Sequence, residues 1–175
     1  MNQSRQSPCR QKPSVAVVGA GPSGLAACKT LAAHGVDYTA YEAGERVGGQ
    51  WVLDNSSGTS VAYRSLVVNT HKGMCRYSDF PLPDHYPAFP GHAEMEDYFD
   101  SYAKHFDLYP RIRCGTRVEQ AEARPQGGYT LELDGGEQVE HDVLLVASGN
   151  LWDLSLIHIS EPTRPLYISY AVFCL

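Results

Sequence analysis

The sequence has little of what marks several special classes of protein. Its 175 residues include only five cysteines, which are scattered and form no CxxC pair, so neither a disulfide framework nor a zinc site is expected. His71, His85 and His92 match no metal-ligand spacing, and we expect no metal. No apolar run approaches the ~20 residues that a bilayer span needs. Lys and Arg total 14 against 20 Asp and Glu, without a basic cluster, which leaves no electrostatic footprint for nucleic acid.

The composition that remains is that of a globular protein. Hydrophobic residues make up 43% and charged residues 19%, which excludes wholesale disorder. Residues 1–13 are polar and lack the apolar segment of a secretory signal. We therefore expect a disordered leader over 1–13, a single domain over 14–153, and a location in the reducing cytoplasm.

The first chemical motif is a glycine turn between a predicted strand and a predicted helix. A β-branched apolar run over residues 15–18 fits a strand buried in a parallel sheet. The spacing G-x-G-x-x-G follows as Gly19-Ala20-Gly21-Pro22-Ser23-Gly24, and a helical apolar stripe continues to about residue 34. Gly19 permits the tight turn, Gly21 lets backbone N–H groups approach a pyrophosphate, and Gly24 permits close packing of helix on strand.

An acidic residue completes this unit. Residues 36–41 predict a second strand that ends at Glu42, about twenty residues beyond the glycine motif, where a carboxylate can accept two hydrogen bonds from a ribose diol. The same glycine spacing alone also occurs in ordinary glycine-rich turns, and a strand-end acid can simply be solvated. The ordered series of strand, turn, helix, strand and acid favours an α/β, Rossmann-like dinucleotide-binding domain.

The stretch that follows indicates which dinucleotide is bound. Residues 43–51 alone fit either a glycine-rich loop with a core tryptophan or a close approach to a flat or phosphorylated ligand. With the preceding motif, however, they resemble the FAD fingerprint of two-dinucleotide-fold flavoproteins. Gly48-Gly49-Gln50-Trp51 resembles the GGxW signature of flavin-containing monooxygenases and their Baeyer–Villiger relatives. The resemblance implies that FAD binds here and that NADPH binds a later Rossmann unit.

A central block distinguishes among these relatives. Residues 63–74 and 77–83 resemble the "Y-x-S-L-x-x-N-T-x-K-x-M … Y-S-D-F-P-x-P" block of the flavin-containing monooxygenases that oxygenate soft nitrogen and sulfur atoms. By residue type alone, Asn69 is a strand-end or turn residue. The resemblance implies instead that Asn69 is catalytic, near the reactive edge of the flavin and the nicotinamide, and that Thr70 beside it binds the cofactor. We expect Phe80 to anchor this block and Asp79 to cap a turn or helix.

The second half of the sequence predicts a helix and a β-meander. Apolar positions over residues 93–106 recur at helical spacing and indicate a core-facing helix. Three β-like runs follow, over 112–123, broken by Gly115, over 129–133 and over 138–146. In the family this meander packs on the parallel sheet, and its last strand returns to that sheet. The resemblance also places Val118 at the adenine and Ser148-Gly149 at a strand end by the cofactor.

The end of the sequence differs from the rest. Residues 154–175 resemble the conceptual translation of a sequencing adapter: two adapter segments encode 154–164 and 168–175, and an index accounts for the residues between them. We expect this tail to be foreign to the protein, the alternative being a genuine divergent C-terminus. Resequencing the locus from an independent library distinguishes the two. The family's FxGxxxH motif and second glycine motif, for NADPH, do not occur, so we expect an incomplete FAD domain without the NADPH domain.

The resemblance implies a monooxygenase that inserts one oxygen of O₂ into a small nucleophilic N or S substrate through a C4a-hydroperoxyflavin, using FAD and NADPH. We expect the 175 residues alone to lack NADPH-dependent oxygenase activity. Two alternatives are a non-catalytic FAD-binding fragment and another two-domain flavoprotein, such as a Baeyer–Villiger enzyme or a disulfide reductase. The absence of a CxxC pair disfavours the reductase. The sequence does not identify the substrate or the oligomeric state.

Overall fold

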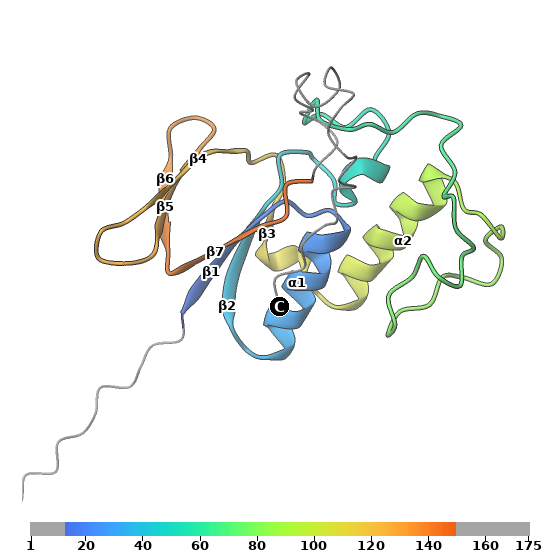
Figure 1. The fold of residues 1–175 in the computed structure, drawn as a ribbon, viewed down its shortest axis with the longest axis horizontal. Helices are drawn as coiled ribbons and strands as arrows, with labels where there is room; N and C mark the ends of the chain where they lie inside the picture. Colours follow the sequence, from blue (N-terminus) through green and yellow to red (C-terminus); the bar gives the residue numbers. More distant parts are fainter. Residues whose placement is uncertain (1–12, 150–175) are drawn as a thin grey trace, which may run out of the picture.

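The computed structural model describes residues 13–149. Four parallel strands form one sheet in the order β3-β2-β1-β7: β1 is Ser14–Val18, β2 Asp37–Tyr41, β3 Ile112–Arg113 and β7 Val143–Val146. A second, antiparallel sheet has the order β4-β5-β6, with β4 Val118–Ala123, β5 Tyr129–Leu133 and β6 Gln138–His141. The helices are α1 (Pro22–Ala33) and α2 (His92–His105), with short turns η1 (Gly49–Trp51) and η2 (Tyr109–Arg111). Figure 1 shows the antiparallel sheet and α2 at opposite ends, with α1 between them.

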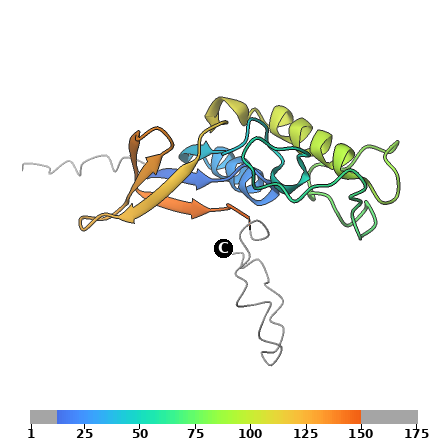
Figure 2. The same ribbon diagram turned by 90° about the horizontal axis from the view of Figure 1, so that it is seen from above.

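The parallel sheet is covered on both faces, because neighbouring residues of a strand point to opposite sides. Val15 and Val17 of β1 belong to a core formed with α1 and α2, whereas Ala16 belongs to a core formed with Leu131 and Leu133 of β5. Figure 2 shows the same arrangement turned by 90°, with the antiparallel strands at one end and the helices toward the other. Burial on both faces explains why the first strand is a continuous apolar run, and the expected Rossmann-like fold is confirmed.

Both predicted helices are present. α1 ends one residue earlier than expected, and Gly35 follows it with φ +61°, donating its N–H to the Ala32 carbonyl at 3.0 Å. This is the left-handed position that favours glycine after a helix. In α2, Met95, Tyr98, Phe99 and Tyr102 are buried and Phe106 caps the end. The predicted core-facing stripe is therefore confirmed.

Two of the three predicted meander runs are divided in the structure. The run 112–123 splits at Gly115 (φ +63°): β3 pairs in parallel with β2, and only β4 joins the antiparallel sheet. The run 138–146 splits at Asp142 into β6, which pairs with β5, and β7, which pairs with β1. Asp142 fixes this crossing, because its carboxylate accepts hydrogen bonds from the Ser14 N–H at 2.8 Å and the Ser14 hydroxyl at 3.0 Å. The return of the last strand to the parallel sheet is as predicted.

The leader over 1–12, the stretch 150–153 and the adapter-like tail over 154–175 lie outside the described residues. Within residues 13–149, no helix is both long and apolar enough to cross a bilayer.

A buried histidine lies where the two sheets meet, and it predicts a pH-dependent stability. His141 is 8% exposed; its Nε2 lies 2.9 Å from the Tyr41 hydroxyl, and its Nδ1 has no partner. Burial lowers the pKa of His141, against the opposing effect of Asp142 and Asp37. The unfolded chain therefore binds a proton at higher pH than the folded chain. The stabilisation is complete above a pH of about 6.5 and decreases as the pH falls through the folded pKa.

We expect the free energy of unfolding from urea titrations to fall between about pH 7.5 and about pH 5.5, and to fall less in His141→Gln. Glutamine can keep a bond to Tyr41 but does not titrate. Carboxyl groups titrate below this window, so they contribute little to the change in the free energy of unfolding between these two pH values. An equal loss of stability in the variant would contradict the assignment to His141.

Candidate functional site

The glycine turn joins β1 to α1 with no room for a side chain at Gly19 or Gly24. Gly19 has φ +99° and donates its N–H to the Tyr41 carbonyl at 2.8 Å. A Cβ built on Gly24 would lie 1.9 Å from the Gly19 carbonyl oxygen, and one built on Gly19 would lie 2.5 Å from the Ala147 oxygen. Helix, turn and β7 are thus in backbone contact, as the predicted roles of Gly19 and Gly24 require.

The N-terminus of α1 opens from this turn. Gly21 is the N-cap, Pro22 is the first helical residue and Ser23 is exposed. No side chain caps the helix and its first turn contains no acid. The positive end of the helix dipole and the free N–H groups are therefore available to an anion, which is the environment that a pyrophosphate needs.

Glu42 lies at the end of β2 against the glycine turn. It is 6% exposed, and its carboxylate accepts the Ala20 N–H at 2.7 Å and the Gly44 N–H at 2.8 Å. Each carboxylate oxygen has a further lone pair for another donor. The structure gives this acid a role that the sequence does not reveal. Glu42 joins the glycine turn, through Ala20, to the loop that follows β2, through Gly44, at the edge where the ribose contact is predicted.

The second glycine loop packs directly on the first. The Gly48 N–H donates to the Ala20 carbonyl at 3.0 Å. Gly49 has φ +58°, and a Cβ on it would lie 2.9 Å from the Gly21 Cα. Two motifs distant in sequence thus form one backbone-lined surface at the N-terminus of α1, a cradle that side chains would fill.

A pocket of about 550 Å³ adjoins this surface. It brings together four predicted site residues: Gln50 and Trp51 from η1, and Asn69 and Thr70 from the loop after the run 66–68. The other lining residues are Tyr63, Leu66, Val67, Val68, Cys75 and Met95. Asn69 and Thr70 are exposed, while Trp51 is half-buried. The pocket therefore combines an apolar wall with a few amide and hydroxyl groups, as small-molecule sites do.

The remaining predicted residues lie near the glycine turn or at the second sheet. The Cα of Ser148 lies 3.4 Å from a Cβ built on Gly19, and Gly149 follows it with φ +85°. Val118 begins β4 and packs on the core between the sheets. The residues just before β4 contact the end of β2, because the Thr116 N–H donates to the Glu42 backbone carbonyl at 2.8 Å. Val118 does not line the pocket.

The structure also places in the pocket two residues that the sequence does not mark. Met95 follows the helical core pattern, and nothing in that pattern marks it as a pocket residue; Cys75 gave no signal at all. Asp79 forms an ion pair with Lys29 of α1, and the Lys29 ammonium lowers the pKa of Asp79. Its expected role in capping a turn or helix stays a prediction. Phe80 anchors its block as expected, packing on Tyr98 at a ring-centroid distance of 5.4 Å.

Among the described residues, no cluster of His, Cys, Asp or Glu could hold a metal.

Comparisons with known proteins agree with this geometry. The model of the family described as flavin-binding monooxygenase-like matches residues 12–149. The chain is 38% identical to human flavin-containing monooxygenase 5 over 148 residues, covering 79% of the chain and 28% of that relative. It is 36% identical to human dimethylaniline monooxygenase (N-oxide-forming) 4, covering 87% of the chain and 27% of that relative. The chain thus spans less than a third of these curated relatives.

Two solved structures have the same fold. S-allyl-L-cysteine S-oxygenase from Allium sativum superposes with a TM-score of 0.72 at 25% identity, covering 79% of the chain and 37% of that protein. A structure described as oxidized steroid monooxygenase bound to NADP superposes with a TM-score of 0.70 at 28% identity, covering 83% of the chain and 27% of that protein. The family match confirms the expected resemblance to flavin-containing monooxygenases, and the second of these neighbours is described with NADP bound. The chain belongs to the flavin-binding monooxygenase-like family.

Proposed function

We propose that this chain is the FAD-binding part, over residues 14–153, of an NADPH-dependent monooxygenase acting on soft nitrogen or sulfur atoms of small molecules. The observation that carries the proposal is the contact of the two glycine loops beside Glu42, at the open N-terminus of α1. When bound, FAD supplies hydride acceptance from NADPH and the activation of O₂. The chain's own residues bind and orient it.

Each predicted residue has a role in this proposal. The turn from Gly19 to Gly24 and the first turn of α1 hold the pyrophosphate through backbone N–H groups. Glu42 accepts hydrogen bonds from the ribose. Val118 lies on the adenine side, and Ser148 and Gly149 lie where β7 ends beside the turn.

The flavin ring is assigned to the pocket next to η1. Trp51 and the residues 66–68 exclude water from one side, and Gln50 and Thr70 supply hydrogen bonds. Asn69 presents an amide that can both donate and accept, and the proposal places it at the reactive edge of the ring. Groups that keep water away from a bound flavin would limit side reactions there.

A Baeyer–Villiger enzyme is the main alternative, since structures of steroid and cyclohexanone monooxygenases share the fold. The block over residues 63–83 favours N- and S-oxygenation. The two reactions give different products, so assay of the longer protein with a thioether, a tertiary amine and a cyclic ketone distinguishes them. We expect NADPH-dependent S-oxide and N-oxide. A lactone as the dominant product would establish the alternative.

Asn69 provides a test within the chain itself. We expect Asn69→Ala to change the visible absorbance spectrum of bound FAD while its Kd stays within about threefold of the parent value, because one hydrogen bond at the ring edge is a small part of the total binding free energy. A spectrum identical to that of the parent complex would place Asn69 away from the flavin.

A further inference from the structure

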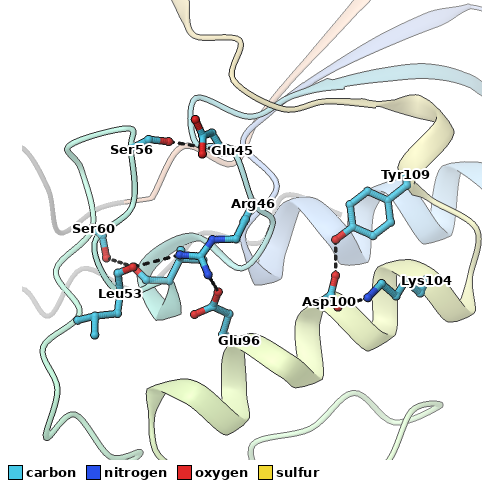
Figure 3. A network of polar contacts seen from close by, with 10 residues as sticks. Glu45, Arg46, Leu53, Ser56, Ser60, Glu96, Asp100, Lys104 and Tyr109 are labelled. Carbon is cyan, nitrogen blue, oxygen red and sulfur yellow. Dashed lines mark hydrogen bonds and ion pairs between the residues drawn. The ribbon is translucent and has the colours of Figure 1, made fainter.

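The loop that carries Gly49, Gln50 and Trp51 is fastened at two points. On one side, Gly48 donates to the Ala20 carbonyl in the glycine turn. On the other, the guanidinium of Arg46 forms an ion pair with Glu96 of α2 and donates to the Leu53 carbonyl at 3.3 Å. Figure 3 shows Arg46 between these two partners.

Arg46 therefore connects both ends of the turn that contains η1. Residue 46 precedes η1 and residue 53 follows it, so a bond between them closes the loop around Trp51. The hydroxyl of Ser60 reinforces the exit by donating to the Val52 carbonyl at 2.6 Å. Within the loop, Trp51 and Val52 donate to Gly48 and Gly49.

The ion pair also sets the distance between two walls of the pocket. Glu96 is the neighbour of Met95, which is 2% exposed and lines the same pocket as Trp51. The ion pair between Arg46 and Glu96 therefore links the side of the pocket formed by η1 to the side formed by α2.

The exposure of the pair argues against a large role in stability. The Arg46 side chain is 57% exposed and that of Glu96 is 20% exposed. Ion pairs so exposed contribute little to the free energy of folding. A loss of this pair should consequently move the loop more than it weakens the fold.

Building on the proposed function, we propose that Arg46 is a positioning residue, which acts with Glu96 to fix Trp51 against the pocket and so prepares the flavin site. It does not itself need to touch the cofactor.

The test uses Trp51 as its own reporter. Trp51 and Trp152 are the only tryptophans, so the full chain with Trp152→Phe carries a single indole. In this background we expect Arg46→Met and Glu96→Gln each to increase acrylamide quenching of Trp51 and to weaken FAD binding by up to about fivefold, the range of an exposed ion pair, with unchanged thermal midpoints. The double variant should be no worse than Arg46→Met, because that change already removes both the ion pair and the bond to the Leu53 carbonyl. The charge-reversed pair Arg46→Glu with Glu96→Arg should restore part of the loss.

Lys104→Met is the matched control. It removes another ion pair of α2, with Asp100 at 2.5 Å, at a site whose lysine side chain is 67% exposed. We expect neither quenching nor FAD affinity to change. Unchanged Trp51 quenching in both Arg46→Met and Glu96→Gln would overturn the inference, as would additive losses in the double variant. A parent chain that binds no FAD would refute the proposed function instead, and the quenching measurements would still decide the role of Arg46.

Discussion

Gly24→Ala is expected to unfold the domain or destabilise it severely. The new methyl group would lie 1.9 Å from the Gly19 carbonyl oxygen, which is backbone and is itself held in the turn. Relief requires moving α1 away from β1, which disrupts the core around Val17 and Leu25. Overpacking against a fixed backbone costs about 3 kcal/mol or more, a large part of the stability of a small domain. Urea titration followed by circular dichroism measures the loss.

Gly21→Ala is the matched control, because the same methyl group is added three residues earlier. Gly21 has φ −73°, and its Cβ would lie 3.5 Å from the Gly49 Cα, an ordinary contact. We expect this variant to fold with near-parent stability but to lose FAD binding, since its methyl group occupies the approach to the pyrophosphate. If Gly24→Ala were as stable as Gly21→Ala, the assigned packing of α1 on the turn would be wrong.

Glu42→Gln should have the second-largest effect. The carboxylate accepts one backbone N–H on each oxygen, from Ala20 and Gly44, in a buried position. The amide has a single acceptor oxygen, so its NH₂ group must face one of these donors and leave it unpaired. We expect a loss of about 1.5–3 kcal/mol in the free energy of unfolding. FAD binding should weaken about a hundredfold, because the loops and the ribose lose the same acceptor.

Glu45→Gln is the control for charge, since Glu45 is exposed three residues further along. It should leave both stability and FAD affinity unchanged. Equal affinity for FAD in the Glu42→Gln and Glu45→Gln chains would remove Glu42 from the site.

The local elements of the fold are predictable from sequence because their signals are local. The strand before Gly19, the helix from Pro22 and the acid at position 42 follow from adjacent residue types, and the buried face of α2 follows from its periodicity. The break at Gly115 is also visible in the sequence, but the division at Asp142 and the sheet that each piece joins are not, because an apolar strand does not reveal which sheet it joins. That choice depends on long-range contacts, such as the bonds of Asp142 to Ser14.

The sequence singles out candidate site residues, but it does not show how they assemble. Gln50, Trp51, Asn69 and Thr70 were singled out by motif, and the structure brings them into one pocket. The packing of the second glycine loop on the first could not be anticipated, because it depends on backbone contacts between distant segments. Arg46 lies within the stretch 43–51 but is not one of its signature residues, and only the fold shows its partner on α2.

The most direct test of FAD binding is a titration of the purified chain with FAD, followed by tryptophan fluorescence and by the visible flavin spectrum. The site described here predicts saturable binding of one FAD per chain with a Kd of about 1 µM or tighter, and its loss in folded Gly21→Ala. A parent chain that is folded by circular dichroism yet shows no saturable FAD binding would contradict the proposal.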